Sequence, residues 1–312
     1  MQEKEVNQLE YWRNIRIGKA KKVLEDYEGA IESFSNAIKF DDNRFNAYFY
    51  RGNVYSIINY HEHAIIDYTE TLIRKKSSFY KEFILEKRGK EFLKTFEYQR
   101  ALIDFNKAID IKKSANLIFL KAFTYSKFGN LKISYRAFNK SKEINPDIFL
   151  KYQTLIDDLD PIMKVLLNLR KKQKLNINNP LINDIEIFSR CIFNKGKGIN
   201  SGNIYFLRDR ANIYLKLKIY IGVIEDLTKF ISYCLKTNDQ SKLNIYTKKE
   251  IGLAYSYRGL AYYKENNIIN AKKDLEQAIN LNPACITNNL INKFEGKTRR
   301  FLETLNYFNK VI

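Results

Sequence analysis

The sequence predicts an all-α fold, an α-solenoid in which antiparallel helix pairs stack one after another. Small residues recur with a period of 34, as at Gly18 and Gly52 (52 − 18). The hydrophobic residues between them follow helical spacing. The four prolines in 312 residues all fall where that spacing breaks. A core that grows by stacking also suits a chain longer than one ordinary hydrophobic core supports.

The stretch 254–283 contains one complete unit. Gly259 and Ala271 lie twelve positions apart (271 − 259), on the facing sides of two successive helices, where small side chains let the backbones approach. Tyr262 and Leu275 fill the space beside them. A proline ends the second helix, because it lacks the amide donor and disfavours helical geometry in its predecessor.

This pattern resembles the tetratricopeptide repeat (TPR), which has a small residue late in the first helix, an aromatic three residues on, alanine and a large residue in the second helix, and a closing proline. The resemblance implies an α-solenoid that binds another protein. Further units carry the pattern with variation, and the small residues of the first helices are Gly18, Gly52, Gly89, Ala122, Ala211 and Gly259.

We expect about six repeats in two blocks, followed by a C-terminal capping helix. The expected parts are a four-repeat block at 11–148, an irregular helical linker or degenerate pair at 149–202, a two-repeat block at 203–285 and a capping helix at 286–312. Within the linker, Asp160-Pro161 and Asn179-Pro180 each read as a helix cap followed by proline. Between the last two units, 14 extra residues (48 − 34) form either a polar loop or an extension of the sixth unit's first helix.

Composition limits the class of protein. The net charge of +19 favours nucleic-acid or membrane-surface binding, or reflects a composition rich in Lys, Asn, Ile and Tyr. The lysines are spread along the chain, which favours the compositional explanation. The N-terminus has no apolar run, and no stretch approaches a membrane span. Three widely separated cysteines fit neither a disulfide framework nor a zinc site, so we expect a cytoplasmic protein.

No group of residues indicates a reaction. His61 and His63, the only histidines, are two residues apart, so on a helix they point in different directions and cannot share a metal. No phosphate-binding loop, HExxH motif or nucleophile elbow occurs. We attribute the carboxylates of Asp157, Asp158 and Asp160 to a solvated helix end. We therefore expect a non-enzymatic protein without a cofactor or a metal site.

The resemblance implies that ligands bind the inner face, which first-helix residues line. In this chain that face is basic with interleaved aromatic rings, and it suits an extended, acidic segment of a partner protein. The residues predicted to contact the partner are Asn53, Lys90, Lys94, Phe119, Phe123, Lys127, Arg208, Asn212 and Lys216.

Two alternatives to a specific acidic ligand stay open. The lysines of the inner face are equally explained as ordinary solvated helix residues. The chain could also bind RNA or ribonucleoprotein through its lysine-rich faces, with no insertion into a membrane. Extra phosphate contacts would then come from Arg170, Lys171, Lys172, Lys174, Lys297, Arg299 and Arg300.

A co-chaperone role is disfavoured. Some relatives hold the C-terminal carboxylate of chaperones with five polar residues, and four of the five corresponding positions depart here. Those positions hold Ile15, Lys19, Tyr50, Phe83 and Lys87.

Overall fold

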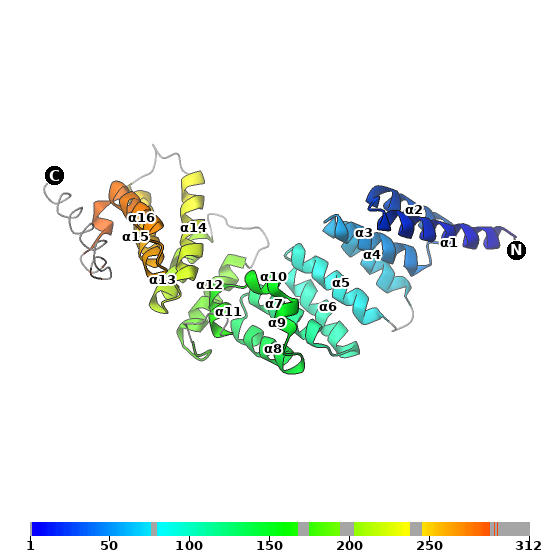
Figure 1. Cartoon of the computed structure of the whole chain (residues 1–312), viewed down its shortest axis with the longest axis horizontal. Helices are drawn as coiled ribbons and strands as arrows, with labels where there is room; N and C mark the ends of the chain where they lie inside the picture. The colour runs from blue at the N-terminus through cyan, green and yellow to red at the C-terminus, as the bar shows by residue number, and fades with distance from the viewer. Residues whose placement is uncertain are drawn as a thin grey trace. The chain divides into compact units, whose positions relative to one another are not determined.

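The computed structural model describes residues 2–75, 80–167, 175–193, 203–237, 245–287, 290 and 292 (Figure 1). Every regular element within these ranges is a helix, and most helices that follow one another in the chain pack side by side. The predicted all-α solenoid fold is therefore confirmed. By compactness the chain forms two units: unit 1 is Met1–Lys127 with Lys132–Asp157, and unit 2 is Phe128–Leu131 with Asp158–Ile312.

Unit 1 consists mainly of four helix pairs. Each pair has a first helix, which carries the small residue, and a second helix that packs against it. In order, the helices are α1 (Gln2–Val23), α2 (Tyr27–Phe40), α3 (Phe45–Ile57), α4 (His61–Arg74), α5 (Lys81–Lys94), α6 (Tyr98–Ile111), α7 (Ala115–Lys127) and α8 (Leu131–Ile144).

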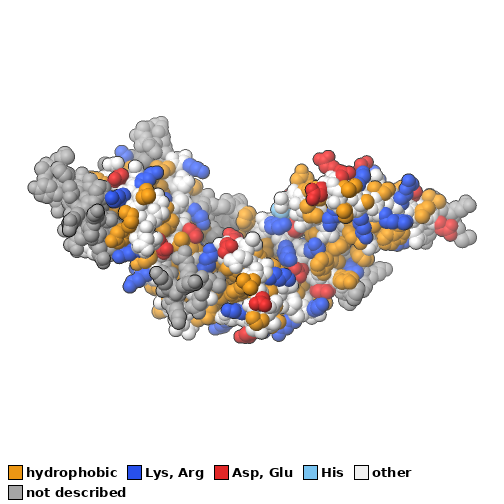
Figure 2. Space-filling view, viewed as in Figure 1, with side chains coloured by type: hydrophobic (Ala, Val, Ile, Leu, Met, Phe, Trp, Pro, Cys, Tyr) orange, Lys and Arg blue, Asp and Glu red, His pale blue; other side chains and the backbone are white. Residues whose placement is uncertain are grey.

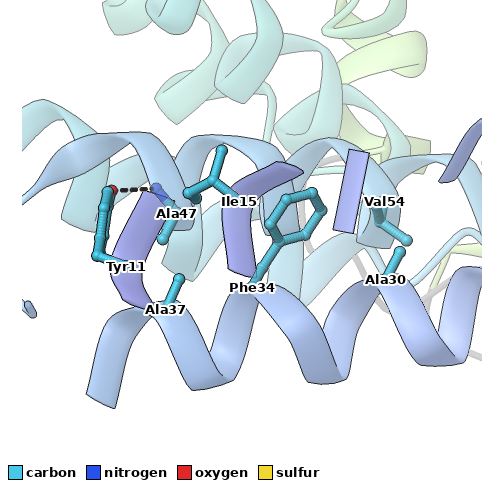
Figure 3. Close-up of a cluster of buried hydrophobic side chains, with 7 residues drawn as sticks. All are labelled: Tyr11, Ile15, Ala30, Phe34, Ala37, Ala47 and Val54. Atoms are coloured by element: carbon cyan, nitrogen blue, oxygen red, sulfur yellow. Dashed lines mark hydrogen bonds between the residues drawn. The ribbon is translucent and has the colours of Figure 1, made fainter. Parts of the chain in front are cut away.

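Small residues sit at the helix crossings, as the sequence predicts. A Cβ atom added to Gly18 would lie 2.6 Å from the ring of Phe34, and one on Gly89 would lie 2.6 Å from Phe105. Both rings are fully buried, so the crossing distance depends on the missing side chain. Figure 3 shows the core of the first pair, where the Tyr11 hydroxyl also accepts a hydrogen bond of 3.1 Å from the Ala47 amide.

A repeated ion pair connects the helices, and the sequence analysis missed it. In four pairs, an arginine just before the small residue donates two hydrogen bonds of 2.7–2.9 Å to an aspartate sixteen residues later. Its third nitrogen donates to a hydroxyl on the preceding second helix. The sets are Arg51, Asp67 and Ser35; Arg88, Asp104 and Thr69; Arg210, Asp226 and Ser189; and Arg258, Asp274 and Thr228.

Two short helices follow the fourth pair, α9 (Ile148–Lys151) and α10 (Gln153–Asp157). Phe149 packs against Phe119 and Phe138, with ring centroids 5.8 Å apart in both cases. In the second pair, Phe49 makes the same kind of contact with Phe83 of the next first helix. α9 and α10 therefore occupy the position that the first helix of the next pair would take. The 34-residue repeat of the sequence does not continue through this segment.

Unit 2 begins with α11 (Pro161–Leu166) and α12 (Leu181–Phe193), which start directly after the two helix caps predicted within the linker. Both predicted caps form: Asp160 accepts a hydrogen bond of 3.1 Å from the Ile162 amide, and Asn179 accepts one of 3.0 Å from the Leu181 amide. The Asp160 carboxylate also accepts a hydrogen bond of 2.5 Å from the Tyr214 hydroxyl. These contacts attach the linker to the next helix pair.

The remaining helices are α13 (Ile204–Lys216), α14 (Tyr220–Thr237), α15 (Ile245–Lys264), α16 (Ile268–Leu281) and the short 3-10 helix η2 (Pro283–Cys285). Most of the extra residues before the sixth unit lengthen α14 and α15, to 18 and 20 residues, while 238–244 lie outside the described residues. Of the expected capping helix, Ile286 and Leu290 pack against the core of α15 and α16, and almost all of the rest lies outside the described residues.

Candidate functional site

The exposed sides of α1, α3 and α5 form one continuous surface, which we call the first inner face. Its side chains are Lys19 and Lys22 of α1, Phe49 and Tyr50 of α3, and Phe83, Lys87 and Lys90 of α5. The Lys19 ammonium lies 4.1 Å from the Tyr50 ring centroid. The Phe49 and Phe83 centroids are 6.2 Å apart, and the Lys87 ammonium lies 5.0 Å from Phe83. Contacts therefore run across all three helices.

Lys87 stands in an unfavourable position for a cation. Burial and the charges of Lys90 and Lys22 lower the pKa of Lys87, against a smaller opposing effect of Glu86 and Glu91. Within the part of the chain that the structure describes, no carboxylate lies within salt-bridge distance of Lys87 or Lys22. The first inner face thus holds positive charge that no described carboxylate of the chain pairs with.

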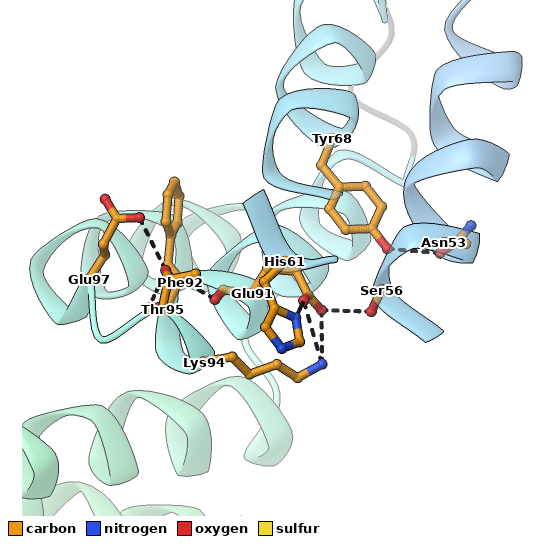
Figure 4. A network of polar contacts seen from close by, with 9 residues as sticks. All are labelled: Asn53, Ser56, His61, Tyr68, Glu91, Phe92, Lys94, Thr95 and Glu97. Carbon is orange, nitrogen blue, oxygen red and sulfur yellow. Dashed lines mark hydrogen bonds and ion pairs between the residues drawn. The ribbon is translucent and has the colours of Figure 1, made fainter. Parts of the chain in front are cut away.

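Three of the predicted contact residues are already engaged within unit 1, and Figure 4 shows two of them, Asn53 and Lys94. Asn53 accepts a hydrogen bond of 3.1 Å from the Tyr68 hydroxyl. Lys94 lies 3.3 Å from Glu91, a buried carboxylate that also accepts from Ser56 at 2.7 Å and contacts the His61 ring nitrogen at 2.7 Å. Outside this network, Lys90 pairs with Glu86 at 2.6 Å.

Phe119 and Phe123 do not face an open groove, and the sequence-based placement of these two rings is corrected. Phe119 is 0% exposed and Phe123 4%. Phe119 stacks on Tyr152 with centroids 4.6 Å apart, because α9 and α10 cover this part of α7. Lys127 lies over the Phe123 ring at 5.3 Å. The aromatic stripe expected on the fourth pair is therefore core.

Three other predicted residues line one groove in unit 2. Arg208, Asn212 and Lys216 belong to α13 and face α15 across a groove of about 600 Å³. Arg208 is fixed by Glu250 at 2.6 Å and by Asp209 at 3.0 Å. The groove is also lined by the apolar side chains Leu215, Leu227, Leu253 and Ala254, and by Lys249 and Tyr257.

Comparison with known proteins identifies the repeats. A family model described as a TPR repeat matches residues 18–56, and one described as a tetratricopeptide repeat matches residues 252–285. The chain carries tetratricopeptide repeats. A TPR repeat-containing protein of Methanocaldococcus jannaschii is 28% identical over 130 residues, which cover 39% of this chain and 23% of the relative. The chain thus aligns with less than a quarter of that relative's length.

The chain also resembles solved structures, with low sequence identity. A tetratricopeptide repeat protein from Parabacteroides merdae aligns with a TM-score of 0.47 and 15% identity, over 96% of this chain and 99% of that one. MamA aligns with a TM-score of 0.40 and 15% identity, over 86% of this chain and 95% of that one.

The charge of this TPR chain is not gathered in one place on the side shown. Figure 2 shows lysine and arginine side chains scattered over the visible surface, with acidic side chains among them. In the described parts of the TPR units, no three side chains of His, Cys, Asp or Glu come together as metal ligands. None of the described helices is both long enough and apolar enough to cross a bilayer.

The sequence-based set of contact residues omitted Lys87 and Phe83, which lie on α5 at one side of the first inner face. Both were weighed only as positions of a chaperone-binding pattern from which four of five residues depart. The available signal was their spacing: Phe83 and Lys87 are four residues apart, so they share one side of a helix. Which neighbours they meet on α1 and α3 depends on how the TPR helices stack, which spacing alone does not give.

Proposed function

We propose that the chain is a non-enzymatic interaction scaffold that binds a segment of a partner protein, with acidic residues, along its first helices. The observation that carries the proposal is the groove of about 600 Å³ that brings Arg208, Asn212 and Lys216 together. A groove of this size accommodates several side chains of an extended segment. The proposal also includes an intracellular location. It includes as well the division into four parts that the sequence predicts, at 11–148, 149–202, 203–285 and 286–312.

Each residue of the groove has a distinct role in this proposal. The exposed amide of Asn212 can donate to and accept from the backbone of an extended segment. Lys216 and Lys249 are exposed and have no carboxylate partner among the described residues, so they are available to carboxylates of a ligand. Arg208 is already paired, and it acts by holding α13 and α15 together at the groove.

Affinity capture from a cell lysate, followed by mass spectrometry, tests this function. The variant Asn212→Ala with Lys216→Glu should lose a protein that the unchanged chain captures. Lys273→Glu is the matched control, because Lys273 is exposed on the second helix α16, away from the groove lining. Circular dichroism should show equal helicity for all three. If both variants retain the same captured proteins, the groove is not the binding site.

The alternative, RNA binding through lysine-rich faces, has a separate test. Binding to homopolymer RNA that weakens steeply with salt would support it. No binding at low salt would exclude that alternative.

A further inference from the structure

We propose that a groove on the outer side of unit 1, between α4 and α6, binds an aromatic side chain of a partner protein. The groove has a volume of about 480 Å³, and we call it the outer groove. The residues that carry the proposal are Ile73 of α4, Leu85 and Arg88 of α5, and Ile111 of α6, all of which line it. The outer groove is separate from the groove beside α13 and adds a second interaction surface to the proposed function.

The outer groove lies on the side of α5 that faces away from the first inner face. Lys81, Leu85 and Arg88 line it at spacings of four and three residues, so they share one side of the helix. Phe83 and Lys87 of the first inner face are each two residues from Leu85, which places them on the opposite side. A ligand of the outer groove therefore contacts a different surface from a ligand of the inner face.

In two other helix pairs, the arginine of the repeated ion pair lies between two aromatic rings. One ring comes three residues before the arginine and the other four residues after it. A guanidinium within about 6 Å of a ring centroid is attracted by the electron-rich ring face. The sets, with distances from the guanidinium carbon to the centroids, are Arg51 with Tyr48 (5.8 Å) and Tyr55 (6.0 Å), and Arg258 with Tyr255 (5.2 Å) and Tyr262 (5.8 Å).

Arg88 has such a ring on one side only, among the residues that the structure describes. Phe92, four residues later, lies 5.7 Å from its guanidinium. Three residues earlier the chain has Leu85, which supplies no ring. The Arg88 side chain is 17% exposed where it lines the outer groove. An aromatic ring from a partner would contact this guanidinium as Tyr48 contacts Arg51.

A second substitution keeps the outer groove open. Arg74 stands 37 positions before Ile111 (111 − 74), and its guanidinium covers the Tyr48 ring at 4.3 Å. Ile111 has no charged head to reach across α5, and it is 43% exposed, while Ile73 is 69% exposed. A ring that covers these two isoleucines removes apolar surface from water, which favours binding.

The leucine alone does not create such a site. Leu207 stands three residues before Arg210 in the pair of α13 and α14. Arg210, however, is only 3% exposed, because it is bound by Asp226 at 2.7 Å and by Asp160 at 3.2 Å. A ligand cannot reach that guanidinium. Arg88 thus differs from the other three arginines of the ion-pair series.

Charge at the outer groove indicates which residues would flank the ring. Lys81 and Lys107 are exposed, against one exposed carboxylate, Asp110. Arg88 itself is neutralised by Asp104 at 2.8 Å. The remaining charge complements a partner segment that has a carboxylate next to its aromatic residue.

A nucleobase suits the outer groove less well than the ring of tyrosine or phenylalanine. Its polar edge would lie against Ile73 and Ile111 and would lose hydrogen bonds to water without replacement. Asp110 would also repel the phosphates of the same strand. A protein segment is therefore the better occupant.

Saturation-transfer NMR with the full chain tests the inference. The probe is an unlabelled heptapeptide of Gly and Ser with a central Tyr flanked by two Asp residues. The ring protons of the tyrosine should receive the strongest saturation. Replacing this tyrosine by leucine should weaken binding about fivefold, about 1 kcal/mol. An oligouridine of equal charge should bind less tightly than the tyrosine peptide.

Variants of the chain locate the site. Ile73→Ser with Ile111→Ser should weaken binding of the tyrosine peptide about fivefold, without a change of charge. Ile66→Ser with Ile144→Ser is the matched control, because these isoleucines of second helices are 58% and 48% exposed and do not line the outer groove. The control should change affinity less than about twofold.

Leu85→Tyr supplies the missing ring from the chain itself. It should block the tyrosine peptide while circular dichroism shows unchanged helicity. A loss of helicity would show that no ring fits beside Arg88 and would overturn the inference. So would unchanged binding in this variant, equal binding of the leucine peptide or of the oligouridine, or equal effects of the two isoleucine double variants. Capture that depends on Asn212 and Lys216 involves none of these residues, so the proposed function is tested separately.

Discussion

The repeated arginine–aspartate pair gives the sharpest test of how the helices are held together. Its most buried example joins Arg210 and Asp226, whose side chains are 3% and 2% exposed. Two hydrogen bonds of 2.7 and 2.8 Å connect them. Burial disfavours the charge of Arg210, but Asp226, Tyr214 and Asp160 together raise the pKa of its guanidinium well above the ordinary value.

Asp226→Ala removes the main partner and leaves a buried guanidinium. Breaking a buried ion pair from one side costs about 3–5 kcal/mol. Asp160 remains 3.2 Å from the guanidinium, so we expect the lower end, about 3 kcal/mol. The matched change Asp104→Ala should cost less, because its partner Arg88 is 17% exposed and water reaches the freed guanidinium.

Hydrogen exchange measured by mass spectrometry suits this prediction, because stacked repeats need not unfold in one step. Amides of α13 and α14 should exchange about a hundredfold faster in Asp226→Ala, since each 1.4 kcal/mol is about tenfold. Amides of α1 and α2 should not change. The double variant Arg210→Met with Asp226→Leu should recover most of the protection, because it removes both charges. A decrease in the free energy of opening of α13 and α14 below about 1 kcal/mol in Asp226→Ala would refute this explanation of the ion pair. So would a double variant that is as unstable as the single one.

Three further predictions concern packing, charge and thiol reactivity. Gly89→Ala should destabilise unit 1 by about 1–2 kcal/mol, because the new Cβ atom would lie 2.6 Å from a buried ring that cannot move away. Gly52→Ala should be nearly neutral, because its Cβ contacts are 3.1–3.3 Å and alanine favours the helix. Thermal unfolding followed by circular dichroism compares the two variants. The pKa of Lys87 is lowered in the folded chain, so ionised Lys87 opposes folding at neutral pH. Lys87→Met should therefore raise the melting temperature at pH 7, by an amount that shrinks as the pH approaches the ordinary lysine pKa of 10.5. A difference in melting temperature that stays the same at all pH values would contradict this. Burial raises the pKa of Cys234 to about 11, so iodoacetamide at pH 8 should label Cys234 more slowly than the partly exposed Cys191. Equal labelling rates would contradict the burial of Cys234 in the structure.

Much of the fold could be predicted from residue spacing alone. The small residues at the crossings, the caps at Asp160 and Asn179, and the helix ends at the prolines are local features, so each could be read where it stands. The ion pairs were equally visible at a spacing of sixteen, but a charged pair is normally read as solvated surface. Only the packing shows that Asp226 is buried.

The sequence by itself determined that this protein is a stack of helix pairs and which helices come first in each pair, because repeat spacing fixes the apolar side of every helix. Only the tertiary structure decided which polar and aromatic residues remain available. Asn53 and Lys94 are used within unit 1, and Phe119 is covered by α9 and α10. Lys87 has no carboxylate partner among the residues that the structure describes. Those outcomes depend on neighbours from other helices, and helical periodicity carries no information about them.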